Sequence, residues 1–206
     1  MSKEIINKWT NLIKSKSKEN NWKFKEYFIF KVEGQFFFDA MFWINGKTNS
    51  LTGVLHFKYA KIDELFWRLT VDNDAIENHP LSLRANGSHI VRPINYYNFE
   101  LKDITETNLT ELLKTIDTKV AEIKERFSTE ESYLNYIREN KVLNEYSYLT
   151  NLLFCKKHDE LLLFIEYCKQ NNITSGIAFF KDGDSEDYFD RITNYIQVAN
   201  CPKGSR

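Results

Sequence analysis

The sequence contains few of the residues that mark several classes of protein. Its 206 residues include only 3 cysteines, Cys155, Cys168 and Cys201, which lie far apart and form no CxxC pair. The odd count and the wide spacing argue against a disulfide framework and against a cysteine zinc cluster. The chain has only 7 glycines and 3 prolines, which argues against a collagenous, loop-dominated or low-complexity protein.

Long apolar runs and an excess of charge are also missing. The longest apolar run, from Phe36 to Ile44, is interrupted by Asp39, and no window offers the roughly 18 uncharged apolar residues of a membrane span. The first 22 residues interleave apolar side chains with Lys and Asn, unlike a signal peptide. Basic residues (28) nearly balance acidic ones (29), and 42% of the chain is hydrophobic. We therefore expect a folded cytoplasmic protein that does not associate with membranes.

Motifs for metals, phosphates and catalysis are absent. No GxGxxG or GxxxxGK[ST] pattern occurs among the glycines, and the four histidines are scattered without an HExxH pattern. The acidic stretch 182–187 has its glycine at the second position, not the sixth that a calcium loop needs, so we interpret it as a turn before a helix. We expect no metal and no cofactor, and the pattern favours a protein without enzymatic activity.

Aromatic residues are abundant, at 15% of the chain, and many lie in segments with clear periodicity. An apolar stripe at helical spacing predicts a helix near the N-terminus: Ile5, Ile6, Trp9, Leu12 and Ile13. A period of two then predicts strands at about 23–32, 35–44 and 51–60, with turns at Glu33-Gly34 and at Gly46–Asn49. A helix over 61–70, a polar connection over 71–80 and one or two strands within 82–101 follow.

The C-terminal half is mostly helical. One apolar stripe predicts a long helix over 107–127, and the capping-box pattern Ser128-Thr129-Glu130-Glu131 predicts the start of another. Further helices are expected at 141–155, 159–171 and 185–199, with a strand at 173–180. This order indicates an α+β fold, an antiparallel β-meander packed on helices with a mostly helical C-terminal third. We expect one compact unit, 1–206, with a division into 1–127 and 128–206 as the alternative.

The alternation of side chains separates two faces of the predicted sheet. One face is almost wholly apolar and should pack on the 107–127 helix: Tyr27, Ile29, Phe36, Phe38, Ala40, Phe42, Ile44, Leu51, Leu55, Phe57 and Tyr59. The opposite face, the mixed face, combines aromatic and polar side chains: Phe24, Glu26, Phe28, Phe30, Phe37, Asp39, Met41, Trp43, Thr52, Val54, His56 and Lys58. The mixed face is therefore where function would be sought.

Asp39 and His56 form the most specific polar pair on the mixed face. A four-residue loop at 46–49 would set them directly opposite each other. A carboxylate beside an imidazole orients one ring nitrogen, which serves general-base pairs and ordinary ion pairs alike, and the ordinary pair is the commoner of the two. The candidate ligand or partner face consists of Glu26, Phe37, Asp39, Trp43 and His56. Arg84 and Arg92 are candidate contacts for an anion.

Three functional hypotheses follow from these features. The leading one is a protein-interaction or regulatory module that binds a protein through the mixed face or the tyrosine-rich C-terminal helices. The alternative is a small-ligand-binding or hydrolytic domain that uses Asp39 and His56, with Glu26 or Arg84 nearby. The third is nucleic-acid binding, because residues 1–31 carry eight Lys against three Glu. The absence of Arg from that segment and the net charge of −1 weigh against the third.

Overall fold

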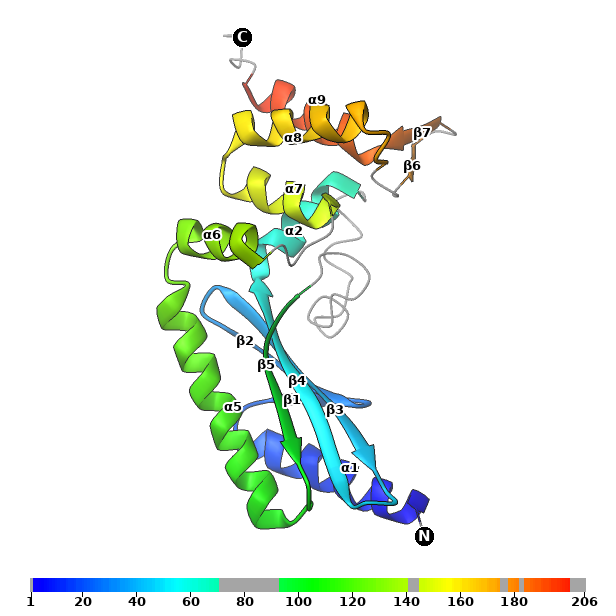
Figure 1. The fold of residues 1–206 in the computed structure, drawn as a ribbon, viewed down its shortest axis with the longest axis vertical. Coiled ribbons are helices and arrows are strands. Elements are labelled where there is room, and N and C mark those ends of the chain that lie inside the picture. The colour runs from blue at the N-terminus through cyan, green and yellow to red at the C-terminus, as the bar shows by residue number, and fades with distance from the viewer. Residues whose placement is uncertain (1, 71–92, 141–144, 175–177, 182–183, 201–206) are drawn as a thin grey trace, which may run out of the picture. The chain divides into compact units, whose positions relative to one another are not determined.

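The computed structural model describes residues 2–70, 93–140, 145–174, 178–181 and 184–200, shown as coloured ribbon in Figure 1. These residues divide into two compact units. Within the described ranges, the first unit contains residues 2–60 and 93–132, and the second contains 61–70 and the residues from 133 onward.

In its described residues, the first unit is a five-stranded antiparallel sheet with two helices. The strands follow one another in the order β1-β2-β3-β4-β5, a simple meander. The elements are α1 (Ser2–Glu19), β1 (Lys23–Lys25), β2 (Phe28–Glu33), β3 (Phe36–Asn45), β4 (Ser50–Tyr59), β5 (Ile94–Leu101) and α5 (Glu106–Arg126). Neighbouring strands in sequence are therefore neighbours in the sheet, as short hairpin connections favour.

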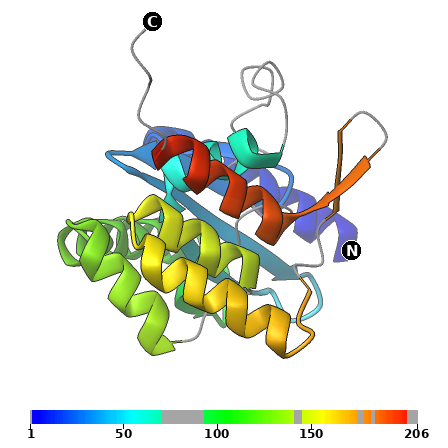
Figure 2. The ribbon, with the colours of Figure 1, turned by 90° about the horizontal axis from the view of Figure 1, so that it is seen from above.

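The second unit is mostly helical, with one small hairpin. Its elements are α2 (Ala60–Thr70), α6 (Glu130–Asn140), α7 (Glu145–Phe154), α8 (His158–Gln170), β6 (Ala178–Lys181), β7 (Asp184–Asp187) and α9 (Tyr188–Asn200). Helices α7 and α8 lie side by side (Figure 2), and the rings of Tyr148 and Phe164 join them edge to face at 5.1 Å. The predicted α+β class, with an antiparallel sheet and a helical C-terminal region, is confirmed.

The two strongest helix signals of the sequence appear at the expected places. The predicted stripe of α5 is buried, from Leu109 to Ile123, and Thr105 caps the helix by accepting a hydrogen bond from the Asn108 amide at 3.1 Å. The Thr129 hydroxyl accepts the Ser132 amide at 3.2 Å at the start of α6. Both caps satisfy amides that a helix leaves unpaired at its N-terminus.

The first predicted strand is wrong in one respect, because it is a hairpin. Residues 26 and 27 form a turn between β1 and β2, and Glu26 has a φ of 53°. The turn sets Phe24 opposite Ile29, so Phe24 lies on the apolar face and not on the mixed face. Glu26 and Tyr27 lie in the turn itself, on neither face. A left-handed turn residue that is not Gly or Asn leaves no turn signal in the sequence.

Several boundaries also differ from the predictions. Helix α1 continues past Ile13, the last residue of the predicted apolar stripe, to Glu19. The loop between β2 and β3 is Gly34-Gln35, one residue later than predicted, and Gly34 supplies the positive φ of 62°. The acidic stretch contributes strand β7, and α9 begins at Tyr188, where the Asp187 side chain accepts the Phe189 amide at 2.7 Å.

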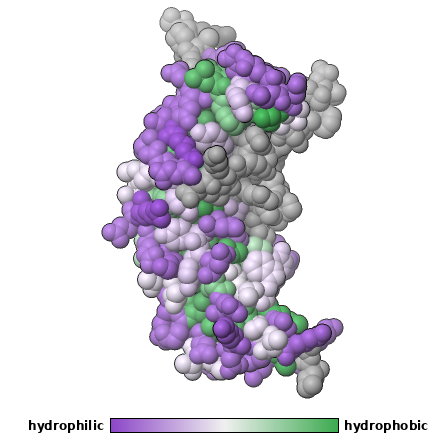
Figure 3. Space-filling view, in the orientation of Figure 1, coloured by the Kyte–Doolittle hydropathy of each residue, from purple (hydrophilic) through white to green (hydrophobic). Residues whose placement is uncertain are grey.

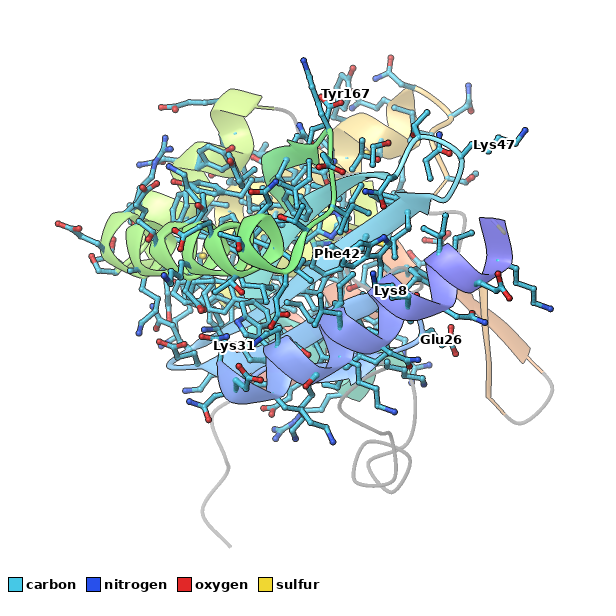
Figure 4. All side chains as sticks on the ribbon, turned by 90° about the horizontal axis from the view of Figure 1, so that it is seen from below. Lys8, Glu26, Lys31, Phe42, Lys47 and Tyr167 are labelled. Atoms are coloured by element: carbon cyan, nitrogen blue, oxygen red, sulfur yellow. The ribbon has the colours of Figure 1, made fainter. Side chains whose placement is uncertain are left out.

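The main core of the first unit lies between the apolar face of the sheet and the two helices. Seen from below, α1 and α5 lie across the same side of the sheet (Figure 4). The ring of Phe57 stacks on that of Phe127 at 4.9 Å, and the Tyr59 hydroxyl donates to the Phe127 carbonyl at 2.8 Å. The indole of Trp22 and the ammonium of Lys31 both donate to Asp117 on α5, at 3.0 and 2.8 Å. These contacts fix α5 along the sheet.

Candidate functional site at the end of strand β3

The predicted register of β3 and β4 is confirmed. Asn45 pairs with Ser50 across the four-residue loop, and Asp39 pairs with His56. The two side chains meet, with His56 Nδ1 at 2.8 Å from Asp39 Oδ2. Because an ionised carboxylate only accepts, the Nδ1 proton of the imidazole is the donor. Both residues are buried, with 2% of Asp39 and 8% of His56 exposed.

The neighbours of this pair on the mixed face form a small apolar core. Phe28, Phe30 and Phe37 are buried in one cluster, and Met41 and Ala60 pack against it. Phe37 is only 2% exposed, and the Lys58 ammonium lies 5.6 Å from the centre of its ring. This part of the predicted partner face is therefore core, and Phe37 offers no surface to a partner.

The far end of β3 is different. Trp43 is 50% exposed, and Tyr27, in the β1–β2 turn beside it, is 47% exposed. Next to these two rings lies a groove of about 360 Å³ between α1, the turn and β3. Its lining is mostly apolar: Ile6, Thr10, Ile13, Phe24, Glu26, Tyr27, Phe42, Trp43 and Ile44. In Figure 4, Phe42 is labelled between α1 and α5, and Glu26 is labelled beside α1.

Polar contacts hold α1, the helical wall of this groove, in place. The Trp9 indole donates to the Asn49 side chain at 2.7 Å, and Asn49 in turn donates to Asp103 at 2.6 Å. Lys16 forms an ion pair with Glu106 of α5 at 3.1 Å. The turn is fixed as well, because the Phe42 amide donates to the Tyr27 carbonyl at 2.9 Å. The groove is thus built from anchored walls, which lowers the entropic cost of binding.

A second, more polar hollow lies on the other side of Trp43. It is lined by Trp43, Thr52, Gly53, Val54, Asn95, Asn98, Phe99 and Glu100. Thr52 pairs with Glu100 and Val54 with Asn98 across β4 and β5, so polar side chains of the mixed face line this hollow together with Trp43. Trp43 therefore borders both the apolar groove and a hollow with more polar side chains.

The predicted site residues separate into two places. The structure joins Asp39 to His56 and buries Phe37 beside the phenylalanine cluster, whereas Trp43 and Glu26 belong to the groove. Arg84 and Arg92 lie outside the described residues. Neither Tyr27 nor the groove was predicted from the sequence as part of a site. A predicted turn at Glu26-Tyr27 would have placed Phe24 on the apolar face, opposite Ile29. It would also have placed Tyr27 at the end of the sheet, where the groove lies.

In the part of the chain that the structure describes, no group of three or more His, Cys, Asp or Glu could hold a metal ion, and no helix combines the length and hydrophobicity of a membrane span. On the second unit, Leu163 and Tyr167 of α8 are exposed. Figure 3 shows hydrophobic residues among hydrophilic ones at the top of the view, where α8 and α9 lie.

Comparisons with known proteins add no function. No family model, no curated protein and no solved structure matches this chain. The groove, its exposed aromatic rings and its surrounding charges are therefore the features from which a function can be inferred.

Proposed function

We propose that this protein is an interaction module that binds a partner protein through the groove at the end of β3. One observation supports the proposal most strongly: Trp43 and Tyr27 are both about half exposed at the edge of an apolar groove. Tryptophan and tyrosine are enriched among the residues that contribute most binding energy at protein interfaces. They provide a large contact area with few rotatable bonds to order, and each keeps a polar group for a hydrogen bond.

The alternative function, a small-ligand-binding or hydrolytic site around Asp39 and His56, has less support than the interaction module. A substrate has to contact a catalytic base, but Asp39 is only 2% exposed and its carboxylate is already engaged by His56. The pair does what an internal ion pair or hydrogen-bonded pair requires, since each polar group satisfies the other. We therefore assign it a stabilising role in the proposal.

The nucleic-acid hypothesis has weaker support for a similar reason. Lys16 is paired with Glu19 and Glu106, and Lys31 with Glu33 and Asp117. Lysines engaged with carboxylates contribute less to the phosphate contacts that dominate nucleic-acid affinity.

The cytoplasmic location expected from the sequence remains a prediction and forms part of the proposal.

The test is a quantitative pull-down with full-length protein and three variants. Trp43→Ala removes the exposed ring of the groove, whereas Tyr195→Ala removes an exposed ring of α9 on the second unit and serves as the matched control. We expect at least one partner to be lost with Trp43→Ala and retained with Tyr195→Ala. Leu163→Ala tests the exposed face of α8. Partners that depend on Leu163 but not on Trp43 would contradict the proposal.

A further inference from the structure

The groove offers main-chain hydrogen-bonding groups as well as apolar side chains. In an antiparallel sheet, a residue directs its N–H and its C=O toward the same neighbouring strand, and successive residues alternate. The Phe42 amide donates to Tyr27 on the β2 side. The main-chain groups of Trp43 therefore face β4, and those of Ile44 face the β2 side again.

Strand β2 does not reach Ile44. The pairing of β2 with β3 ends at Phe28 and Met41, and Tyr27 is the last residue of the turn. Among the described residues, no backbone hydrogen bond reaches Ile44 from this side. Ile44 also lines the groove. Its N–H and C=O thus form a short open strand edge next to an apolar groove, which is the arrangement that strand addition uses.

The charge around the groove indicates the kind of segment it would take. Lys3 and Lys14 of α1 are exposed, and each lies one helical turn from a groove residue, Ile6 or Thr10. The acid at the groove is Glu26. A partner segment with acidic residues on both sides of its apolar centre complements this surface.

We propose that the groove binds an extended acidic-flanked segment of the partner protein, which adds to the open edge of β3 at Ile44. This inference rests on the proposed function, because it names how the same groove holds its partner. Alternate side chains of an added strand point to the same face, so those on the α1 side enter the groove beside Phe42. The main chain of the segment bonds to Ile44, and its acidic ends face Lys3 and Lys14.

Peptides provide the probe. Random dodecamers displayed on phage are selected on the immobilised full-length protein, and those that still bind the Trp43→Ala variant are discarded. The remaining peptides are synthesised, and their affinities are measured by fluorescence anisotropy. We expect an apolar centre with acidic flanks. Replacing the acidic residues with lysine should lower affinity about tenfold or more, and raising salt should weaken binding.

Two substitutions at one position isolate the main-chain contact. Ile44→Pro and Ile44→Ala both remove most of the side chain from the groove, but only proline also removes the N–H. Because the Ile44 amide faces away from β4, proline there costs no bond to β4. We expect Ile44→Pro to bind the selected peptides about tenfold more weakly than Ile44→Ala, the scale of one lost hydrogen bond. Thermal unfolding of both variants verifies that they fold.

Backbone N-methylation of the peptide gives the same test from the other side. A peptide strand that adds to β3 directs every second amide toward β3. Methylation of the amides that face β3 should lower the affinity about tenfold or more, whereas methylation of the amides that face away should have little effect. This pattern also keeps the inference testable if Ile44→Pro fails to fold.

The possible results separate the inference from the proposed function. Selection that yields no Trp43-dependent peptide contradicts both. Strand addition is overturned if the Trp43-dependent peptides bind Ile44→Pro and Ile44→Ala equally and tolerate methylation of either alternating set of amides. The proposed function as an interaction module is unaffected by that result. Basic or uncharged peptides as the tightest binders overturn the acidic segment. A Trp43-dependent dimer in analytical ultracentrifugation identifies a second copy as the occupant and overturns the partner segment.

Discussion

The two ends of strand β3 carry similar side chains on the same face but differ in environment. Phe37 and Asp39 are 2% exposed, whereas Trp43 is 50% exposed. The buried end has a strand on each side, since β2 pairs with β3 as far as Met41 and β4 pairs along its full length. Trp43 lies beyond the end of β2. The comparison shows that the exposed aromatic surface of β3 lies where its pairing with β2 stops, and not where aromatic residues are densest.

The largest expected effect comes from Gly53, opposite Phe42 at the point where β3 changes environment. A Cβ atom at Gly53 would lie 2.2 Å from the Phe99 ring and 2.3 Å from the Met41 carbonyl oxygen. The backbone oxygen cannot move without disturbing the sheet, so Gly53→Ala should reduce the free energy of unfolding by about 3 kcal/mol or more. Urea denaturation measures the change.

Gly34 supplies the control for this substitution. It has a positive φ of 62° but nothing within 4 Å of a built Cβ, and Asn tolerates that conformation. Gly34→Asn should therefore cost less than about 1 kcal/mol. Equal losses for the two glycine variants would show that space around Gly53 is not the limiting factor.

The next effect tests the buried end of the comparison. Asp39→Ala leaves the His56 imidazole buried without its acceptor, and we expect a loss of about 2–3 kcal/mol in the free energy of unfolding at pH 7. Asp39→Asn should lose less, because an amide oxygen still accepts from Nδ1. Chemical denaturation of both variants provides the numbers. A fully stable Asp39→Ala protein that has lost a ligand would assign the pair to function.

The buried end of β3 was more predictable than the exposed end. The alternation of side chains places Asp39 and His56 on the same face of the sheet, and a four-residue loop sets them directly opposite each other. Alternation and loop length together fix the pairing register of two strands. The groove could not be predicted in the same way. Its lining comes from α1, the turn and β3, and the turn at Glu26 has a left-handed residue that its sequence does not announce. Exposure of Trp43 depends on where β2 ends, which alternation alone does not define.

An ion-pair cluster at the buried end should produce a smaller, pH-dependent effect. Hydrogen bonds from Lys124 and Lys31 hold the pKa of Glu33 below its ordinary value, against the opposing effect of partial burial. A lowered folded-state pKa stabilises the fold above the unfolded-state pKa, and this contribution is lost as the pH falls through the folded-state pKa.

Glu33→Gln tests this contribution. Because the carboxylate is 40% exposed and screened by solvent, we expect a loss of only about 0.5 kcal/mol at pH 7. The difference from the unmodified protein should shrink as the pH falls from about 4.5 toward 3. Urea denaturation at pH 7 and pH 3 measures it. A difference that stays constant between the two pH values would argue that packing, not charge, is responsible.

A small effect on stability is also expected for Trp43→Ala. A half-exposed ring at the end of a strand buries little area, so the free energy of unfolding should fall by less than about 1 kcal/mol. The same denaturation experiment applies. A loss above about 2 kcal/mol would mean that Trp43 serves the core, and the contrast between the two ends of β3 would disappear.

The central claim is that β3 has an open edge at Ile44, and amide hydrogen exchange measured by NMR tests it most directly. Trp43 and Ile44 are adjacent, but the Trp43 amide faces β4 and the Ile44 amide faces the groove, so strand-end fraying affects both alike. After correction for intrinsic rates, we predict that the Ile44 amide exchanges about 100-fold faster than the Trp43 amide in the unbound protein. Equal protection of the two amides would contradict the claim.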